Sequence, residues 1–140
     1  MITRRQTLLA AFALLYQHTA AQDRQPPSPS SAEGRVFQHD LPNITMDDWQ
    51  VTVSEVDFPA GRVGRVHHHA GFVLAYVLEG AIVSKVSGQA EKTYQKGEMF
   101  FEPPGSTHEV SNNADQTAPA RLLAMIFAKK GATLTLPGPA

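Results

Sequence analysis

The chain has 140 residues, enough for one compact domain with its own core and too few for two. Its formal charge of -1, without a cluster of lysines and arginines, argues against a nucleic-acid-binding surface. The absence of cysteine excludes disulfides and thiolate metal ligands. Any soft-metal chemistry must therefore rely on imidazole.

The first residues, 1–21, have the pattern of an export signal. Arg4 and Arg5 give a positive start, an apolar run covers residues 7–16, and small residues at 19–21 suit cleavage. The apolar run is too short to anchor the chain in a bilayer. The paired arginines favour a twin-arginine signal, and an ordinary secretory signal is the alternative. Both predict an exported protein, periplasmic or secreted, that has no membrane contact after cleavage.

The next segment, residues 22–34, is rich in Pro, Ser and Gln and nearly free of large apolar side chains. Such a composition cannot bury enough surface to become ordered, so we expect a flexible linker. Residues 35–140 are expected to form one domain. Val36 and Phe37 could begin a first edge strand in it.

Short strands separated by turns are predicted over the rest of the chain. Residues 49–58 alternate between apolar and polar, with Trp49, Val51 and Val53 on the apolar face, whereas residues 72–78 are continuously apolar. Other strands are expected over residues 62–69, 81–86, 92–95, 99–101, 108–111 and 120–128. Residues 133–137 can pair along a sheet edge or dock on a partner chain. No segment has a sustained helical period, and turn residues recur about every 8 to 12 residues. These features predict an all-β sandwich or barrel.

Three consecutive histidines, His67 to His69, precede the most apolar strand. Alternate side chains of a strand share one face, so the outer two can enter one cavity while His68 points the other way. His108 stands downstream, after a Pro-Pro-Gly turn. Such imidazoles can bind divalent Fe, Mn, Ni, Cu or Zn.

Two stretches resemble the signature motifs of the cupin superfamily. The first motif reads Gly, five residues, His-x-His, three or four residues, Glu, six residues, Gly; the stretch Gly61–Gly80, GRVGRVHHHAGFVLAYVLEG, matches it except at the glutamate. The second reads Gly, five residues, Pro-x-Gly, two residues, His, three residues, Asn; the stretch Gly97–Asn112, GEMFFEPPGSTHEVSN, matches it throughout. Val73 and Leu74 stand where the motif-one glutamate belongs.

The resemblance implies an all-β, cupin-type double-stranded β-helix, or jelly-roll barrel, with one divalent metal held by His67, His69 and His108. Most cupins use three histidines and a glutamate, but thiol dioxygenases and a β-diketone-cleaving dioxygenase use three histidines and iron(II). The resemblance therefore favours an iron(II)-dependent dioxygenase for a small enolate, catechol, flavonol or thiol. A lyase or isomerase using Mn, Ni or Zn is the next reading, and copper is a further metal candidate. A non-catalytic cupin that binds or senses a metal or ligand is the alternative, and a barrel that is losing its ligands is a third possibility.

Four further side chains are candidates for the site. Glu102 can be an acid-base group, a substitute fourth ligand or a solvated turn residue, and Tyr76 a catalytic contact or a core residue. Tyr94 and Glu109 are candidates for substrate contacts. Because barrels of this kind usually cover their sheet edges by pairing, we expect a homodimer that takes a small-molecule substrate and no nucleic acid.

Overall fold

The computed structural model describes residue 34 and residues 36–140. These residues belong to the second of the two units into which the chain divides, Ser31–Ala140. The predicted export signal, residues 1–21, and all but the last residue of the predicted linker lie outside the described residues. In the described part of the chain, no helix is long and apolar enough to cross a membrane.

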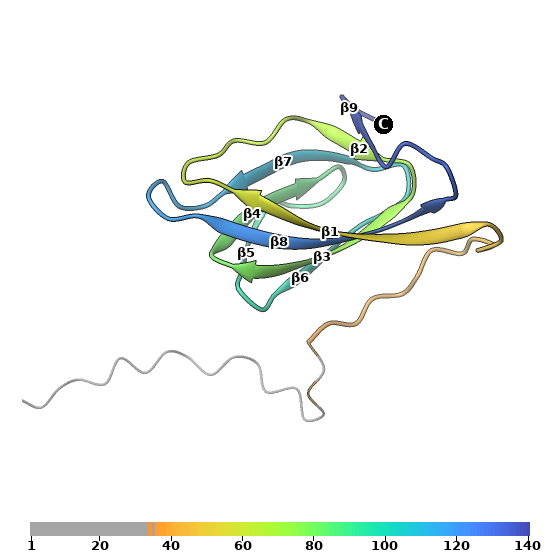
Figure 1. Cartoon of the computed structure of the whole chain (residues 1–140), viewed down its shortest axis with the longest axis horizontal. Helices are drawn as coiled ribbons and strands as arrows, with labels where there is room; N and C mark the ends of the chain where they lie inside the picture. Colours follow the sequence, from red (N-terminus) through yellow and green to blue (C-terminus); the bar gives the residue numbers. More distant parts are fainter. Residues whose placement is uncertain (1–33, 35) are drawn as a thin grey trace, which may run out of the picture. The chain divides into compact units, whose positions relative to one another are not determined.

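Nine strands of the described residues form two antiparallel sheets that pack face to face (Figure 1). The strand order is β1-β8-β3-β6 in the first sheet and β5-β4-β7-β2-β9 in the second. The predicted all-β jelly roll is thereby confirmed. The strands are β1 (Trp49–Phe58), β2 (His67–His69), β3 (Phe72–Glu79), β4 (Ala81–Val86), β5 (Lys92–Gln95), β6 (Met99–Glu102), β7 (Thr107–Asn113), β8 (Ala120–Lys129) and β9 (Thr135–Pro137).

The strand predicted over residues 62–69 is shorter than expected, because β2 covers only its last three residues. Gly64 explains the difference, since its backbone N–H donates to the side-chain oxygen of Asn112 at 3.0 Å. A Cβ atom at Gly64 would lie 2.2 Å from the carbonyl oxygen of Ser111, so the chain can approach β7 this closely only at glycine. Residues 62–66 therefore form an irregular segment that packs against β7.

The apolar face predicted for β1 is the outer face of its sheet. Val51 and Val53 are 51% and 54% exposed, whereas Phe58 is buried. Alternation along a strand determines which residues share a face, but the packing of the two sheets decides which face is covered. Val36 and Phe37, expected to begin an edge strand, lie in no strand.

The hydrophobic core lies between the sheets, beside a cavity. Its members are Phe58, Ala75, Val77, Ile82, Phe100, Ala120 and Leu122, with Val56 and Tyr94 packed against them. Three of the members, Phe58, Ala75 and Leu122, also line the cavity. The hydrophobic core therefore forms part of the cavity lining, and its packing stabilises the strands that supply the rest of that lining.

Candidate functional site

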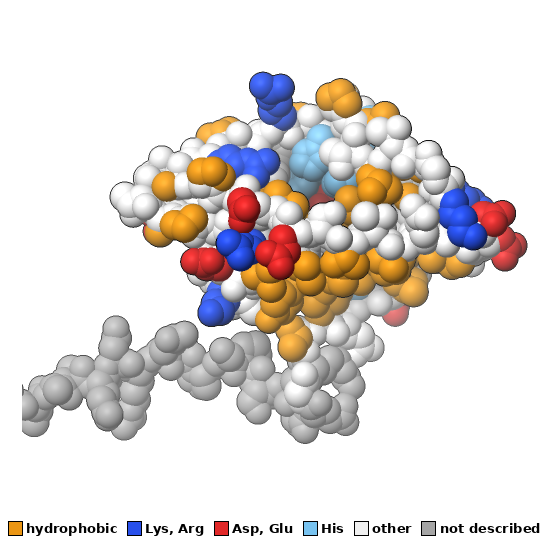
Figure 2. All heavy atoms as spheres, in the orientation of Figure 1, with side chains coloured by type: hydrophobic (Ala, Val, Ile, Leu, Met, Phe, Trp, Pro, Cys, Tyr) orange, Lys and Arg blue, Asp and Glu red, His pale blue; other side chains and the backbone are white. Residues whose placement is uncertain are grey.

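A cavity of about 700 Å³ opens between the two sheets. This volume suits a small organic molecule. Figure 2 shows histidine side chains inside a hollow of the surface. The apolar side chains that line the cavity are mainly those of Val56, Phe58, Val73, Ala75, Leu122, Ala124, Ile126, Leu134 and Pro137. Three histidines and one glutamate lie together in the polar part of the lining.

The three histidines come from neighbouring strands of the second sheet. His67 on β2 lies opposite His108 on β7, so their side chains point to the same face. His69 is two residues further along β2 and shares that face. The ring of His67 has its centroid 4.9 Å from that of His108 and 5.1 Å from that of His69. The structure thus brings the three predicted ligands together, while His68 contacts the carbonyl oxygen of Gly138.

Strand β7 has a β-bulge at Glu109, the residue that follows His108. The β4–β7 pairing changes register between Lys85 and Val86, so Glu109 has no partner on β4. A bulge of this kind re-aims the side chains on either side of it. Glu109 forms an ion pair with Lys85 at 2.6 Å and does not line the cavity. The structure therefore does not bring this candidate to the site.

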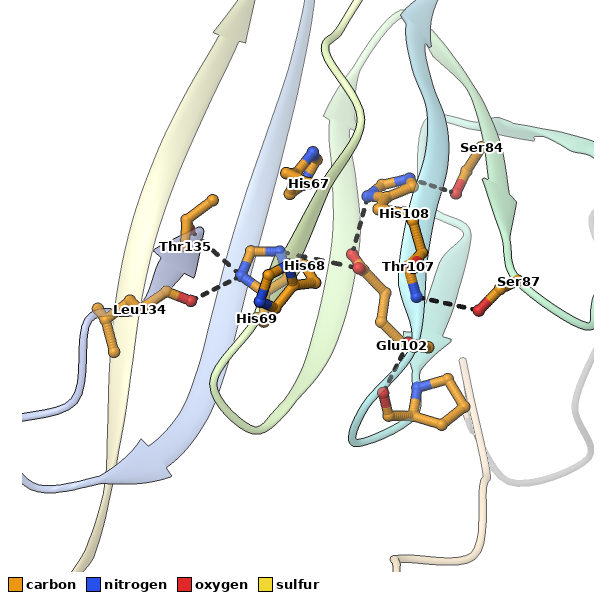
Figure 3. Close-up of polar contacts among 12 residues, drawn as sticks. His67, His68, His69, Ser84, Ser87, Glu102, Thr107, His108, Leu134 and Thr135 are labelled. Atoms are coloured by element: carbon orange, nitrogen blue, oxygen red, sulfur yellow. Dashed lines mark hydrogen bonds and ion pairs between the residues drawn. The ribbon is translucent and has the colours of Figure 1, made fainter. Parts of the chain in front are cut away.

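Glu102 enters the site from the opposite sheet. It lies on β6 and is only 4% exposed, which rules out a solvated turn residue. Its Oε1 atom is 3.3 Å from Nδ1 of His108, and its Oε2 atom is 3.7 Å from Nε2 of His69 (Figure 3). Its partner across the antiparallel β3–β6 pair is Val73. A buried carboxylate thus lies between two of the three histidines.

The surroundings shift the pKa values of two of these groups. Burial works to raise the pKa of Glu102, but the hydrogen bond with His108 and the positive charge that the neighbouring imidazoles carry when protonated outweigh burial, so this pKa lies below its ordinary value. Burial lowers the pKa of His67, and the neighbouring imidazoles lower it further. The hydrogen bond with the backbone of Arg65 raises this pKa but does not offset the other two effects. The site therefore favours an ionised carboxylate and a neutral His67, which are the forms that bind metals.

Backbone carbonyl groups fix the orientation of the two β2 histidines that face the cavity, His67 and His69. Nδ1 of His67 lies 2.8 Å from the carbonyl oxygen of Arg65. Nδ1 of His69 lies 3.0 Å from that of Leu134. A carbonyl oxygen can only accept, so Nδ1 carries a proton in both rings, and Nε2 has a free lone pair whenever the ring is neutral. Metal-binding histidines are commonly oriented by such a contact on the other ring nitrogen.

Both ring nitrogens of His108 already have partners. Nδ1 faces Glu102, and Nε2 lies 2.8 Å from the hydroxyl oxygen of Ser84. Among the described residues, no group of three or more His, Cys, Asp or Glu side chains is arranged to hold a metal ion. The donors nevertheless fit a divalent metal chemically, because imidazole and carboxylate suit Fe, Mn and Zn. The Ser84 hydroxyl can donate or accept, so His108 can change tautomer and free Nδ1 without losing that contact.

The two candidate tyrosines do not reach the cavity. Tyr76 on β3 alternates with Ala75 and Val77, which are buried in the core between the sheets, so its side chain lies on the outer face. Tyr94 packs on Phe100, with ring centroids 4.8 Å apart. Burial raises the pKa of Tyr94. Neither side chain lines the cavity, and Tyr94 packs against the hydrophobic core instead.

The C-terminal strand is a part of the site to which the sequence patterns assigned no role. The predicted edge pairing is confirmed, since β9 pairs with β2. Leu134 and Thr135 line the cavity, and the Thr135 hydroxyl lies 3.2 Å from Nδ1 of His69. The sequence indicates that the C-terminal segment can form an edge strand. It does not indicate that this strand pairs with β2, and the contact with His69 depends on that pairing.

The part of the chain that contains this site matches a protein-family model. The model of the Cupin_2 family, described as a cupin domain, matches residues 54–126. This range is more than half of the chain and contains the three histidines and Glu102. No curated protein matches the chain significantly.

Solved structures share the fold at low sequence identity. The DMSP lyase DddQ of Ruegeria pomeroyi has a TM-score of 0.55 and 21% identity over 62% of this chain and 42% of that protein. The oxalate decarboxylase of Lactobacillus farciminis has a TM-score of 0.53 and 17% identity over 62% of this chain and 26% of that protein. An uncharacterised Klebsiella pneumoniae protein with a double-stranded β-helix domain has a TM-score of 0.50 and 16% identity, over 70% and 81%.

These likenesses establish the fold and not an activity. The matches cover less than half of the length of both enzymes. Fold alone does not determine chemistry, which lies in the residues of the site. The match of the family model and the double-stranded β-helix fold together show that the chain belongs to the cupin domain family.

Proposed function

We propose that this protein is a metal-dependent cupin enzyme that acts on a small organic molecule. The observation that carries the proposal is the meeting of three imidazoles from one sheet and a buried carboxylate from the other in a mostly apolar cavity. His67, His69 and His108 are the proposed metal ligands. When bound, iron(II) would support reactions with O₂, and Mn, Ni or Zn would act as a Lewis acid. Of these we favour the oxygenase, with a lyase or isomerase as the alternative.

The cavity walls indicate which substrates fit. Side chains such as Val56, Leu122 and Ile126 provide apolar surface for a carbon skeleton and exclude water from the polar end of the cavity. Arg62 and Arg65 are exposed and line the cavity, so they add positive potential at its rim. A mostly apolar molecule with an acidic or enolate group matches this distribution.

The coordination state of the iron(II) protein tests the proposal. Untagged protein without the signal segment is loaded anaerobically with iron(II) and then exposed to nitric oxide, a spectroscopic substitute for O₂. We expect the half-integer-spin EPR signal of an iron–nitrosyl centre, and O₂ consumption with a subset of enolates, catechols, flavonols and thiols. If the protein binds no divalent metal, the proposal is wrong.

A non-catalytic metal- or ligand-binding cupin is the second candidate. The observation that favours it is the engagement of both ring nitrogens of His108, one by Glu102 and one by Ser84. A protein of this class would bind the metal without leaving an open coordination position on it. Its iron(II) form would then give no nitrosyl signal. That result would transfer the assignment from enzyme to binding protein.

Replacing Ser84 with alanine is expected to weaken the binding of Mn²⁺ about tenfold, as is typical when a partner that orients a metal ligand is lost. Ser84 is 3% exposed and is the partner of Nε2 of His108, so its removal leaves that ring free to turn. Isothermal titration calorimetry measures the change. Ser111→Ala is the matched control, because Ser111 is also a buried serine, and it lines the cavity, but it has no hydrogen bond to a histidine among the described residues. Equal affinities of the Ser84 variant and the wild type would contradict this role.

Deleting residues 134–140 is expected to weaken Mn²⁺ binding by about 10- to 100-fold while leaving the fold intact. The deletion removes the carbonyl group of Leu134 that orients His69, but it removes no member of the hydrophobic core. Calorimetric titration gives the affinity, and circular dichroism checks the fold. Thr135→Val retains the carbonyl contact and should keep most of the affinity. A folded, truncated protein with wild-type affinity would show that β9 does not position His69.

A further inference from the structure

We infer that Glu102 supplies, from β6, the carboxylate that the first cupin motif lacks on β3. The inference rests on the proposed metal-dependent function, and it assigns to the metal centre a residue that lies in neither motif's ligand positions. It also changes the composition of the centre from three neutral imidazoles to three imidazoles and one anion.

The strand register places Glu102 beside the vacant motif position. Val73 has the required spacing from the motif-one glycine, with six residues between it and Gly80, and it lines the cavity, whereas Leu74 does not. Glu102 is the direct partner of Val73 in the antiparallel β3–β6 pair. Directly opposed residues have Cβ atoms about 5 Å apart on the same face of the sheet. A carboxylate at position 102 therefore enters the cavity one strand away from the usual position.

The contacts of the Glu102 side chain point to a cation. Among the described residues, its ion-pair partners are two imidazoles, His108 at 3.3 Å and His69 at 3.7 Å, and it has no lysine or arginine partner. A buried carboxylate needs a compensating positive charge, and neutral imidazoles do not supply one. A metal ion bound by the imidazoles is a cation that satisfies all four groups together. A protonated histidine is the competing explanation.

The added carboxylate has a consequence for metal selectivity. Carboxylate oxygen suits Mn²⁺ and iron(II), whereas imidazole alone also serves Zn²⁺ and Cu²⁺ well. Removing the negative charge of Glu102 should therefore weaken the binding of Mn²⁺ more than that of Zn²⁺. A carboxylate that only pairs with a protonated histidine would compete with the metal, and its loss would not produce this difference.

The test compares Mn²⁺ and Zn²⁺ affinities by calorimetry in three variants. Glu102→Gln keeps the shape of the side chain without its charge, and we expect Mn²⁺ affinity to fall at least about tenfold. Glu109→Gln is the control, because Glu109 also neighbours His108 in sequence but pairs with Lys85 outside the cavity. The swap Val73→Glu with Glu102→Val moves the carboxylate back across the strand pair, and we expect it to regain Mn²⁺ binding lost in Glu102→Gln.

The outcomes separate this inference from the proposed function. Unchanged Mn²⁺ affinity in Glu102→Gln, with metal bound by the wild type, overturns the role of Glu102 and leaves the metal-dependent function standing. A wild type that binds no metal overturns both. If Glu102→Gln does not fold, the swap decides: wild-type-like binding supports the inference, and a folded swap that does not bind Mn²⁺ refutes it.

Discussion

Replacing His108 with alanine is expected to lower the affinity for a divalent metal at least about 100-fold, beyond the usual effect of losing a partner that only orients a ligand. His108 is the sole proposed ligand from β7. It contacts Ser84 within its own sheet and Glu102 on the opposite sheet, so it links the two sheets. Its loss removes an imidazole and leaves the buried carboxylate with fewer partners. Metal content after dialysis, together with calorimetric titration, measures the effect.

The matched control for this variant is His68→Ala. His68 lies in the same run of histidines, but its Nδ1 atom contacts the carbonyl oxygen of Gly138, 3.1 Å away, and it does not line the cavity. We expect the His68 variant to bind metal as the wild type does. Equal losses in the two variants would mean that the run of histidines binds metal without the geometry of the cavity.

Replacing Ile82 with alanine is expected to lower the free energy of unfolding by about 3 kcal/mol. Ile82 has no exposed surface, and it lies in the core cluster opposite Tyr94 on β5. The truncated side chain would leave a cavity that the surrounding strands can fill only in part. For a domain of about this size, such a loss lowers the melting temperature by roughly 10 to 20 °C.

Urea unfolding followed by circular dichroism measures the loss in Ile82→Ala. Val63→Ala serves as the control, because Val63 is 74% exposed and should change stability by less than about 0.5 kcal/mol. A loss below about 1 kcal/mol for the Ile82 variant would mean that the core cluster does not carry the stability of the sandwich.

Much of the fold could be predicted from local patterns. The alternation in residues 49–58 and the apolar run in residues 72–78 predict β1 and β3, and turn residues delimit the others. The spacing of the histidines within a strand predicts that His67 and His69 share a face. The phase of a strand relative to the core was harder to predict, because it depends on how the two sheets pack. This is why Val51 and Val53 are on the outer face.

The role of Glu102 depends on contacts that sequence spacing does not reveal. Beside a Pro-Pro-Gly turn a glutamate resembles a solvated turn residue. The structure shows instead that Glu102 pairs with Val73 and lines the cavity. The orientation of His69 likewise depends on Leu134, which is 65 residues away in the chain. Export of the protein and the expected homodimer stay predictions.

The most direct measurement is the metal content of untagged protein after loading and dialysis, determined by mass spectrometry for the wild type and for His67→Ala and His108→Ala. We expect one divalent metal ion per chain in the wild type and none in either variant. A wild type that retains no metal after loading would contradict a metal centre in this cavity.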